Sequence, residues 1–283
     1  MNNDNIRSYG ILYVVSLPIG NLRDITLRAI DILSSVSAIV CEDSRVTSKV
    51  LGTYNIKNSM IPCYGSSDTY IIKALDILKS GKDVALVSDA GTPLISDPGY
   101  DVVLNAIKHG FKVHTIPGPC SAISALSISG IDSSNFFFYG FLPTKKNQTH
   151  QELEKILSYG VTSIIFESPR RLISTLELLK SMHPQIVIAV ARELTKIFEE
   201  VIRGTVSEVL DVLNNKNVLK GEIVIVISSI NKNTDDFQDA IKLLENLLLE
   251  GNSVKDSISE TLSLYPTLKK GDLYKYTLQS MKR

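Results

Sequence analysis

The chain has 283 residues, of which 44% are hydrophobic and 21% charged, the composition of an ordinary soluble globular protein with room for two modest domains. Its 30 basic residues equal its 30 acidic residues, so global charge gives no reason to expect nucleic acid as a partner, and any basic surface must be local. The apolar runs are far shorter than the roughly 18–20 residues that span a membrane, and the N-terminal stretch lacks the features of a secretory signal.

Three cysteines, Cys41, Cys63 and Cys120, are widely spaced and form no C-x-x-C pattern. Because their number is odd and no pattern pairs them, we expect small buried residues rather than a disulfide framework. A reducing, cytoplasmic location follows from this expectation.

Short β-branched runs alternate with helical stretches in the first part of the chain. Strands are expected at 11–17, 38–42, 83–88 and 112–117. Helices are expected at 26–36, at 68–81 and from about Tyr100. This alternation predicts a mostly parallel sheet covered by helices, which we assign to an N-terminal α/β domain at residues 1–117.

A second α/β domain is assigned to residues 118–230, where strands follow strands more often. Its strand segments are expected at 136–143, 162–169, 186–194, 199–205 and 221–229. Two helix starts lie between them: Ser168-Pro169 places proline at the first helical position, and Thr205-x-x-Glu208 has the spacing of a capping box. We therefore expect a mixed α/β sheet.

The composition changes after Ser229. A polar linker is expected at 230–236, and the extension 231–283 then reads as three short helices. These fit a helix-turn-helix-like module, or equally a helical tail that packs on the core or on a partner subunit. The end of the tail is basic, which could meet phosphates or form a solvated face. Its charged residues are Lys269, Lys270, Lys275, Lys282 and Arg283, with one acid, Asp272.

Four loops at predicted strand ends are rich in small and turn-forming residues. They span 16–24, 88–99, 116–122 and 166–171. The carboxyl ends of parallel strands share one edge of a sheet, and ligands bind there. Gly and Pro let the backbone approach a ligand closely, and the free N–H groups of the following helices favour anionic groups. One such loop is explained by tight turn chemistry, whereas four on one edge predict a binding cleft.

Several familiar sites are excluded by the pattern. The sequence has no G-x-x-x-x-G-K-[ST] phosphate loop, no G-x-G-x-x-G and no G-x-S-x-G nucleophile elbow. The four histidines are scattered without metal-ligand spacing, so no metal site is predicted.

Charged residues follow two of the apolar strands directly. The segment "CEDSR" at 41–45 carries Asp43 and Arg45, and "ARELTKIFEE" at 191–200 carries Glu193 and Lys196. Such residues form ion pairs at the rim of a cleft or take part in catalysis. A carboxylate beside a cation can have its pKa adjusted for proton transfer, so these four are the candidate catalytic residues.

Taken together, the motifs resemble the tetrapyrrole methylase superfamily, in which they occur in the same order. They read "LYVVSLPIGNLRDITLRAIDIL", "EDSR", "SDAGTPLISDPG", "IPGPCSA", "GFLPTKK", "FESPRRL", "ARELTK" and "KGEIVIVI" and cover about residues 11–229. Within that superfamily the chain most resembles the branch that methylates the ribose 2'-hydroxyl of cytidine 1402 in 16S rRNA. The helical extension also suits that branch.

The resemblance implies two α/β domains of the class III methyltransferase type, with S-adenosylmethionine bound in a cleft between them, in a homodimer. The cofactor-binding residues it implies are Pro18, Asp89, Ala90, Gly91, Thr92, Pro93, Ile95, Ser96, Asp97, Cys120, Ser121, Ala122, Phe166 and Glu167. Their backbone groups and hydroxyls suit a carboxylate and a ribose, and the two aspartates suit a cationic sulfonium.

For the implied reaction, orientation in line with the departing sulfur is expected to provide much of the acceleration. We expect Asp43 or Glu193 to accept the proton of the hydroxyl, and Arg45 and Lys196 to position a phosphate or the developing oxyanion. The implied substrate is the folded ribosomal subunit, and further contacts to its phosphates are expected from local basic residues on the surface of this chain. These are Arg23, Arg28, Lys145, Lys146, Arg170, Arg171 and the basic end of the tail.

Two alternatives stay open from the sequence. The first is a tetrapyrrole C-methyltransferase acting on a porphyrinoid, although such enzymes typically carry a glycine-rich Gly-Asp-Pro loop where this chain has "DAGTPLISDPG". The second is a non-catalytic RNA-binding assembly protein that kept the cleft.

Overall fold

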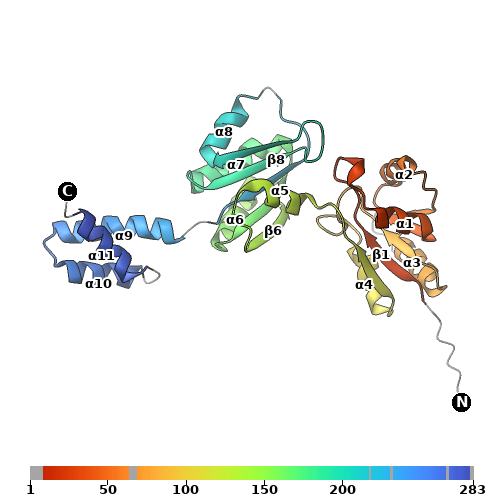
Figure 1. Cartoon of the computed structure of the whole chain (residues 1–283), viewed down its shortest axis with the longest axis horizontal. Helices are drawn as coiled ribbons and strands as arrows, with labels where there is room; N and C mark the ends of the chain where they lie inside the picture. The colour runs from red at the N-terminus through yellow and green to blue at the C-terminus, as the bar shows by residue number, and fades with distance from the viewer. Residues whose placement is uncertain (1–8, 64–68, 217, 230–231, 266–267, 281–283) are drawn as a thin grey trace, which may run out of the picture. The chain divides into compact units, whose positions relative to one another are not determined.

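A computed structural model describes residues 9–63, 69–216, 218–229, 232–265 and 268–280 (Figure 1). The chain divides into two units. The first comprises Met1–Glu154 and Thr162–Ser228, and the second comprises Lys155–Val161 and Ser229–Arg283. Both β-sheets belong to the first unit.

The first sheet has the strand order β3-β2-β4-β1-β5, and every pair in it is parallel. Its strands are β1 (Ile11–Val15), β2 (Ala38–Cys41), β3 (Met60–Pro62), β4 (Val84–Leu86) and β5 (Lys112–Ile116). The connecting elements are η1 (Leu22–Asp24), α1 (Leu27–Ser35), α2 (Ser44–Thr53), α3 (Thr69–Lys79) and α4 (Tyr100–Lys108). The parallel sheet predicted from the alternation is confirmed.

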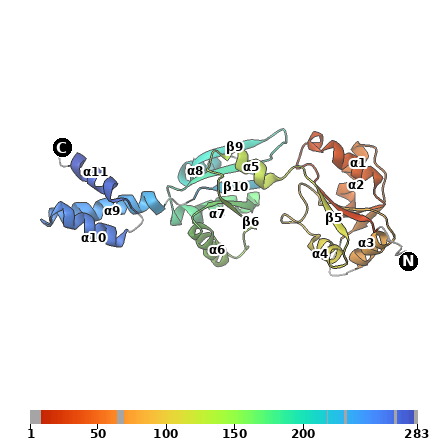
Figure 2. The same ribbon diagram turned by 60° about the horizontal axis from the view of Figure 1, so that its bottom comes forward.

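Helices cover both faces of this sheet, with α1 and α2 on one side and α3 and α4 on the other (Figure 2). Leu33 of α1 and Leu51 of α2 pack with Ile39, while Leu78 of α3 and Val102 of α4 pack with residues of the opposite face. The burial of both faces explains why the strands read as continuous apolar runs. The alternation did not predict α2 or β3, because β3 is a three-residue edge strand that ends in proline.

The second sheet is mixed, as expected, with the order β6-β7-β10-β8-β9. Strand β6 (Phe136–Phe141) is parallel to β7 (Thr162–Glu167), whereas β10 (Ile223–Ile227) runs antiparallel to β7 and to β8 (Val187–Arg192), and β9 (Glu200–Thr205) runs antiparallel to β8. All five residues of the central strand β10 are buried. Helix α5 (Ser121–Ser129) packs on β7, β8 and β10 through its alanines.

Two further helices begin where the sequence predicts. Helix α8 (Val206–Asn214) starts with a complete capping box: Thr205 Oγ1 accepts from Glu208 N, and the Glu208 carboxylate accepts from Thr205 N at 2.8 Å. Helix α7 (Pro169–Met182) has proline at its first position, but the Ser168 side chain makes no capping hydrogen bond. Helix α6 spans Lys146–Ser158.

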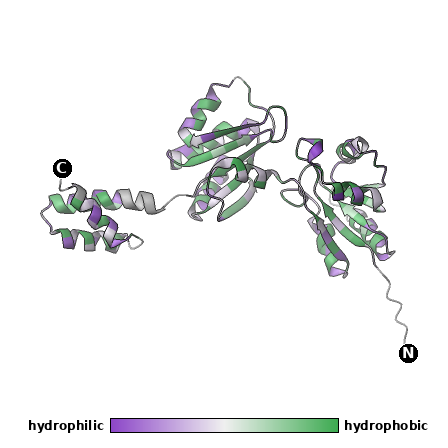
Figure 3. Ribbon diagram, viewed as in Figure 1, coloured by the Kyte–Doolittle hydropathy of each residue, from purple (hydrophilic) through white to green (hydrophobic). Residues whose placement is uncertain are grey.

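The described part of the chain after Ser229 forms helices α9 (Lys232–Leu249), α10 (Val254–Leu264) and α11 (Lys270–Ser280), which carry both hydrophobic and hydrophilic residues (Figure 3). They have their own small core of Ala240, Leu244, Ile258 and Leu273. Residues 232–236, expected as linker, are helical, because no glycine or proline interrupts the chain between 232 and 249. The basic residues Lys282 and Arg283 lie outside the described residues.

The three cysteines are unpaired, and only Cys41 is fully buried, while Cys63 and Cys120 are half-buried. Burial raises the pKa of the Cys41 thiol to about 11, so it stays a neutral core residue. Across the described ranges, every helix is too short or too polar to cross a bilayer.

Candidate active site

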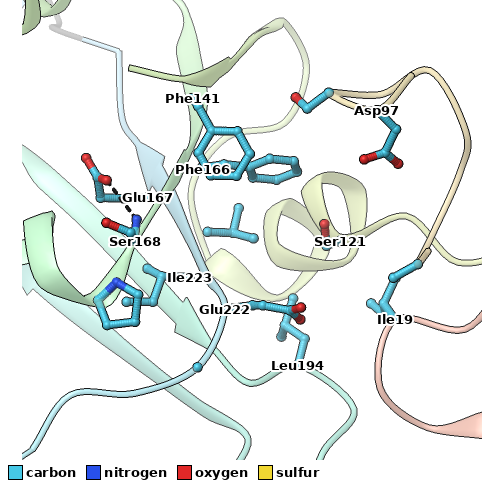
Figure 4. Close-up of a pocket in the computed structure, with 15 residues that line it drawn as sticks. Ile19, Asp97, Ser121, Phe141, Phe166, Glu167, Ser168, Leu194, Glu222 and Ile223 are labelled. Atoms are coloured by element: carbon cyan, nitrogen blue, oxygen red, sulfur yellow. Dashed lines mark hydrogen bonds between the residues drawn. The ribbon is translucent and has the colours of Figure 1, made fainter. Parts of the chain in front are cut away.

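A cavity of about 350 Å³ opens where strand ends and helix starts of the first unit meet (Figure 4). Loops after β1, β4, β7 and β8 contribute residues to it, together with the last residues of β6 and β7 and the starts of α5 and α7. The antiparallel strand β10 contributes its beginning instead of its end, because its direction is reversed. The lining residues are Ile19, Ala90, Ser96, Asp97, Ser121, Phe141, Phe166, Glu167, Ser168, Pro169, Leu194, Gly221, Glu222, Ile223 and Val224.

One wall of this cavity is aromatic. The rings of Phe141 and Phe166 lie with centroids 5.4 Å apart at 65°, and Phe138 packs edge-on against Phe166 at 5.0 Å. Ile223 and Leu194 extend the apolar surface (Figure 4). Such a wall removes water from an apolar or aromatic ligand group and favours its burial.

The loop 88–99 is a tightly tied and strained turn. Leu94 and Ser96 have φ values of 74° and 69°, in the left-handed region that non-glycine residues rarely adopt. Gly91 is fixed by two backbone hydrogen bonds with Leu17, of 2.9 and 3.0 Å. Thr92 Oγ1 lies 3.0 Å from Ser16 Oγ and donates to Pro119 O at 3.0 Å. The loops after β1, β4 and β5 are therefore joined into one rigid block, and backbone strain of this kind concentrates at functional sites.

Acidic groups gather at the ends of β2 and β4. Burial, reinforced by the charges of Glu42 and Asp89, raises the pKa of Asp97 to about 6 despite a hydrogen bond from Ser88. Burial and the neighbouring Asp89 also raise the pKa of Glu42. The Asp89 carboxylate accepts from Asp43 N at 2.9 Å. Because these carboxylates repel one another, the site favours a cationic ligand group beside Asp97.

Two helix N-termini face the same cavity. Ser121 is the first residue of α5, and its N-cap, Cys120, makes no side-chain capping bond. Ser168 stands at the N-cap position of α7 without a side-chain capping bond and donates its N–H to Glu167 Oε1 at 2.7 Å. The N–H groups at the start of α5 lack a side-chain cap, which suits a ligand carboxylate.

Glu167 lines the cavity, but its carboxylate is already paired with other side chains of the chain. It is 3% exposed, its Oε2 accepts from Thr175 Oγ1 at 2.7 Å, and Arg171 Nη2 lies 3.3 Å away. Arg171 also donates to Leu142 O and Pro143 O at 3.0 and 2.8 Å. Arg171, expected to contact phosphate, is thus a clamp that holds the turn after β6 to the start of α7, whereas Arg170 is exposed.

The structure brings part of the expected cofactor-binding set to the cavity wall. Ala90, Ser96, Asp97, Ser121, Phe166 and Glu167 line it. The others lie in the same loops without lining it: Pro18, Asp89, Gly91, Thr92, Pro93, Ile95, Cys120 and Ala122. Residues that sequence reasoning missed are Ile19, Phe141, Ser168, Pro169, Leu194 and Gly221 to Val224. Phe141 and Gly221 lie within two motifs of the resemblance, "GFLPTKK" and "KGEIVIVI", so these motifs could have identified them as candidate site residues.

The four candidate catalytic residues form two ion-paired groups on different loops. Asp43 is the N-cap of α2, and its carboxylate accepts from Arg45 N at 2.8 Å and from the Arg45 guanidinium at 2.6–3.1 Å. Neither residue lines the cavity.

The second group braces the loop between β8 and β9. Glu193 Oε1 accepts from Lys196 Nζ at 2.8 Å and from Glu222 N at 3.0 Å, and Lys196 Nζ also lies 3.0 Å from Glu222 Oε2. The hydrogen bond from Lys196 lowers the pKa of Glu193. Burial opposes ionisation of Lys196, but its hydrogen bonds to Glu193 and Glu222 leave its pKa raised. A carboxylate held in its ionised form this firmly is a weak proton acceptor.

The structure thus has two sheets with helices packed on them, whose loops meet at one cavity beside the rigid turn after β4. The model of the Tetrapyrrole (Corrin/Porphyrin) Methylases matches residues 11–210, and the chain belongs to this family. The family resemblance drawn from the motifs is thereby confirmed.

Curated relatives narrow the family further. The chain is 46% identical over 222 residues to the ribosomal RNA small subunit methyltransferase I of Hydrogenobaculum sp., covering 78% of this chain and 96% of that protein. The protein of the same name from Bacillus subtilis is 40% identical over 259 residues, covering 89% and 88%. That from Vibrio cholerae is 38% identical over 276 residues, covering 96% and 95%.

Solved structures share the fold at low identity. Cobalt precorrin-4 methyltransferase superposes with a TM-score of 0.57 at 16% identity, over 77% of this chain and 94% of that one. Diphthine synthase gives a TM-score of 0.58 at 14% identity, over 77% and 89%. These likenesses bear out the predicted fold class of two α/β domains of the tetrapyrrole methylase type.

Proposed function

We propose that this chain transfers a methyl group from S-adenosylmethionine to the ribose 2'-hydroxyl of cytidine 1402 in the 16S rRNA of the small ribosomal subunit. The observation that carries the proposal is the extent of the likeness to relatives named ribosomal RNA small subunit methyltransferase I. At 38% identity the alignment with the Vibrio cholerae relative spans 96% of the chain, so it reaches into the helical extension as well as the cavity.

The residues of the cavity fit this methyl donor. The Phe141 and Phe166 rings offer an apolar face for an adenine, and the start of α5 offers free N–H groups for a carboxylate. Asp97, with Glu42 and Asp89 nearby, supplies the negative charge that a sulfonium or an ammonium group favours. When bound, S-adenosylmethionine supplies a methyl group on a positively charged sulfur, which becomes a neutral thioether on transfer.

The chain's own part in the reaction is to orient the hydroxyl and receive its proton. As the bond from the ribose oxygen to the methyl carbon forms, that oxygen loses a proton to a base. Asp43 and Glu193 are the two candidates. Each is paired with a cation, Asp43 with Arg45 and Glu193 with Lys196, so ion pairing does not separate them. We assign a bracing role to Glu193 with Lys196, because Glu193 also accepts from Glu222 N and so joins two loops, and the proton-accepting role to Asp43.

We assign to Arg45 the positioning of the acceptor. Its side chain is 83% exposed while it holds the Asp43 carboxylate, so a phosphate of the RNA can reach the guanidinium from solvent. We assign further phosphate contacts to Arg23, Arg28, Lys145, Lys146 and Arg170, which are all exposed. We also propose that the chain forms a homodimer and acts in the cytoplasm.

The porphyrinoid alternative is not favoured by the comparisons. The uroporphyrin-III-C-methyltransferase from Thermus thermophilus is 20% identical to this chain, compared with 46% for the Hydrogenobaculum relative. A non-catalytic assembly protein is not favoured either, since the relatives with the highest identities reported above are named as methyltransferases.

The decisive experiment measures transfer of tritium from labelled S-adenosylmethionine to small subunits that lack the modification. We expect counts in the rRNA fraction, in the 2'-O-methylated cytidine after nuclease digestion. Parallel reactions offer a porphyrinoid acceptor and naked 16S rRNA. Counts in the porphyrinoid would establish the alternative enzyme, and no counts anywhere, with no calorimetric binding of the methyl donor, would leave only the assembly protein.

A further inference from the structure

Two large apolar side chains stand in solvent at the tip of the loop that joins β8 to β9. Ile197 is 95% exposed and Phe198 is 72% exposed. Single exposed apolar residues are common on protein surfaces and need no explanation. Two consecutive exposed apolar residues close to the cavity residue Leu194 do need an explanation.

The exposure is built into the loop and does not come from a slack backbone. Glu193 and Thr195 adopt left-handed φ values of 52° and 65°, which cost energy for residues with a side chain. Lys196 N donates to Glu193 O, and Glu199 N donates to Lys196 O, both at 3.0 Å. These turns direct the tip outward, and a rigid loop of this kind presents its side chains without a large entropic cost on binding.

The same loop is joined to the loop after β1. Asn21 N donates to Thr195 Oγ1 at 2.9 Å, and a Cβ at Gly20 would lie 2.6 Å from Lys196 Cγ, so only glycine fits there. Ile19 and Leu194, one from each loop, both line the cavity. The tip that carries Phe198 therefore belongs to the rim of the candidate active site.

The segment that follows the loop after β1 carries two exposed arginines that can contact phosphates, although Glu199 beside Phe198 is exposed as well. Arg23 of η1 and Arg28 of α1 are exposed and form no ion pair within the described ranges. Asp24 also lies in η1, so the basic character of this edge depends on both arginines. An exposed aromatic ring on a loop that is joined to an arginine-bearing loop is a combination that can hold unpaired RNA, in which the ring stacks on a base and the arginines hold phosphates.

We propose that Phe198 is a specificity-determining residue that stacks on an unpaired base of the RNA substrate close to the methylated nucleotide, with Ile197 packing at its edge. This inference rests on the proposed function, because it names the part of the rim that holds the substrate of that reaction. The stack fixes the RNA strand relative to the cavity, so it contributes to binding of the subunit and not to binding of the methyl donor.

The test compares substitutions of Phe198 in steady-state methylation of small subunits, with full-length protein. Phe198→Ala is expected to raise KM for the subunit about tenfold, equivalent to about 1.4 kcal/mol, with kcat within about twofold of the original. Phe198→Trp is expected to keep the original KM because it still stacks. Phe198→Leu, which keeps apolar area without a flat ring, is expected to behave like Phe198→Ala.

Controls separate this inference from the function on which it rests. Phe136→Ala removes another exposed aromatic ring at the opposite end of β6 from Phe141, and it is expected to leave KM unchanged. Calorimetry with S-adenosylmethionine should give the same Kd for every variant. If the unsubstituted protein methylates subunits and Phe198→Ala keeps its KM, the inference is wrong while the function stands.

A second copy of the chain is the competing occupant of the tip. Sedimentation equilibrium of Phe198→Ala and Phe198→Leu decides this point. If Phe198→Ala dissociates an oligomer that Phe198→Leu preserves, the ring is buried in a protein interface and stacking on RNA is overturned. An unchanged oligomeric state together with the raised KM supports the RNA contact.

Discussion

A Cβ added at Gly221 would lie 2.3 Å from Oε1 of Glu193. Both residues adopt positive φ, 96° at Gly221 and 52° at Glu193, and Glu193 Oε1 accepts from the N–H of the next residue, Glu222, at 3.0 Å. The start of β10 and the loop after β8 are therefore locked together through one carboxylate. Because Gly221 to Val224 line the cavity, this lock determines the shape of its floor.

Replacing Gly221 with alanine should break the lock. The added methyl group meets Glu193 and also forces a left-handed residue, so we expect a loss of about 2–4 kcal/mol in the free energy of unfolding. Urea denaturation of the full chain measures it. Gly52→Ala is the matched control, because Gly52 lies inside α2 with nothing within 4 Å of the new Cβ, and there we expect a gain of about 0.5–1 kcal/mol. Equal effects of the two substitutions would contradict the lock.

Sequence reasoning predicted the parts of the fold that local patterns determine. The alternation of apolar strands and amphipathic helices predicted the parallel sheet, and Thr205 with Glu208 predicted a helix start that the structure shows in full. Both signals lie within a few residues of the feature they predict, so no knowledge of the rest of the chain is needed.

The contacts that complete the site depend on distant pairs. Gly221, before β10, meets Glu193, which directly follows the end of the neighbouring antiparallel strand β8. Arg171 meets carbonyl groups after β6. Sequence reasoning placed ligands at the carboxyl ends of parallel strands, and this rule omits the beginning of a reversed strand such as β10. The contacts of Arg171 were missed because an arginine after a proline-capped helix start gives no local sign of whether it faces solvent or backbone.

The two candidate bases should respond differently to loss of their charge. Asp43→Asn keeps a side chain that caps α2 well but cannot accept the proton, so we expect the rate of methyl transfer in a single turnover to fall about 10²- to 10⁴-fold. Glu193→Gln keeps a side-chain oxygen that can accept from Glu222 N and so preserve the brace, and we expect at most a severalfold loss. Binding of the methyl donor, measured by calorimetry, serves as the control for both. The reverse order of effects would assign the base to Glu193.

The adjacent arginines Arg170 and Arg171 should separate stability from RNA binding. Arg171→Ala leaves the buried Glu167 carboxylate without its cation and frees two carbonyl groups, so we expect a loss of about 3 kcal/mol or more in the free energy of unfolding. Arg170→Ala removes an exposed side chain, and we expect unchanged stability and a KM for small subunits raised about threefold at low salt. The difference in KM should shrink as salt rises, because one phosphate contact fewer lowers the salt dependence of binding. Urea denaturation and methylation kinetics at two salt concentrations measure the pair. A loss of stability in Arg170→Ala would show that it, too, is structural.

Asp97 should make the protein less stable as the pH rises through 6. Its pKa is raised to about 6 in the folded chain, mainly by burial and also by Glu42 and Asp89, compared with about 3.9 for an unfolded aspartate. The folded state therefore binds the proton more tightly, so the contribution is complete below about pH 4 and is lost between pH 4 and 6. Asp97→Asn removes this dependence.

At pH 7.5 we expect Asp97→Asn to be more stable than the unsubstituted chain by about 1–2 kcal/mol, after allowance for the partial exposure of the carboxyl, and equal to it at pH 4. The gain in stability comes with a loss of function, because a neutral amide no longer attracts the cationic methyl donor. Calorimetry at pH 5 and 7.5 measures this second effect: the unsubstituted protein should bind the donor more weakly at pH 5, and the variant should bind it weakly at both. An Asp97→Asn variant whose affinity equals that of the unsubstituted protein at pH 7.5 would remove Asp97 from the donor site while leaving its effect on stability intact.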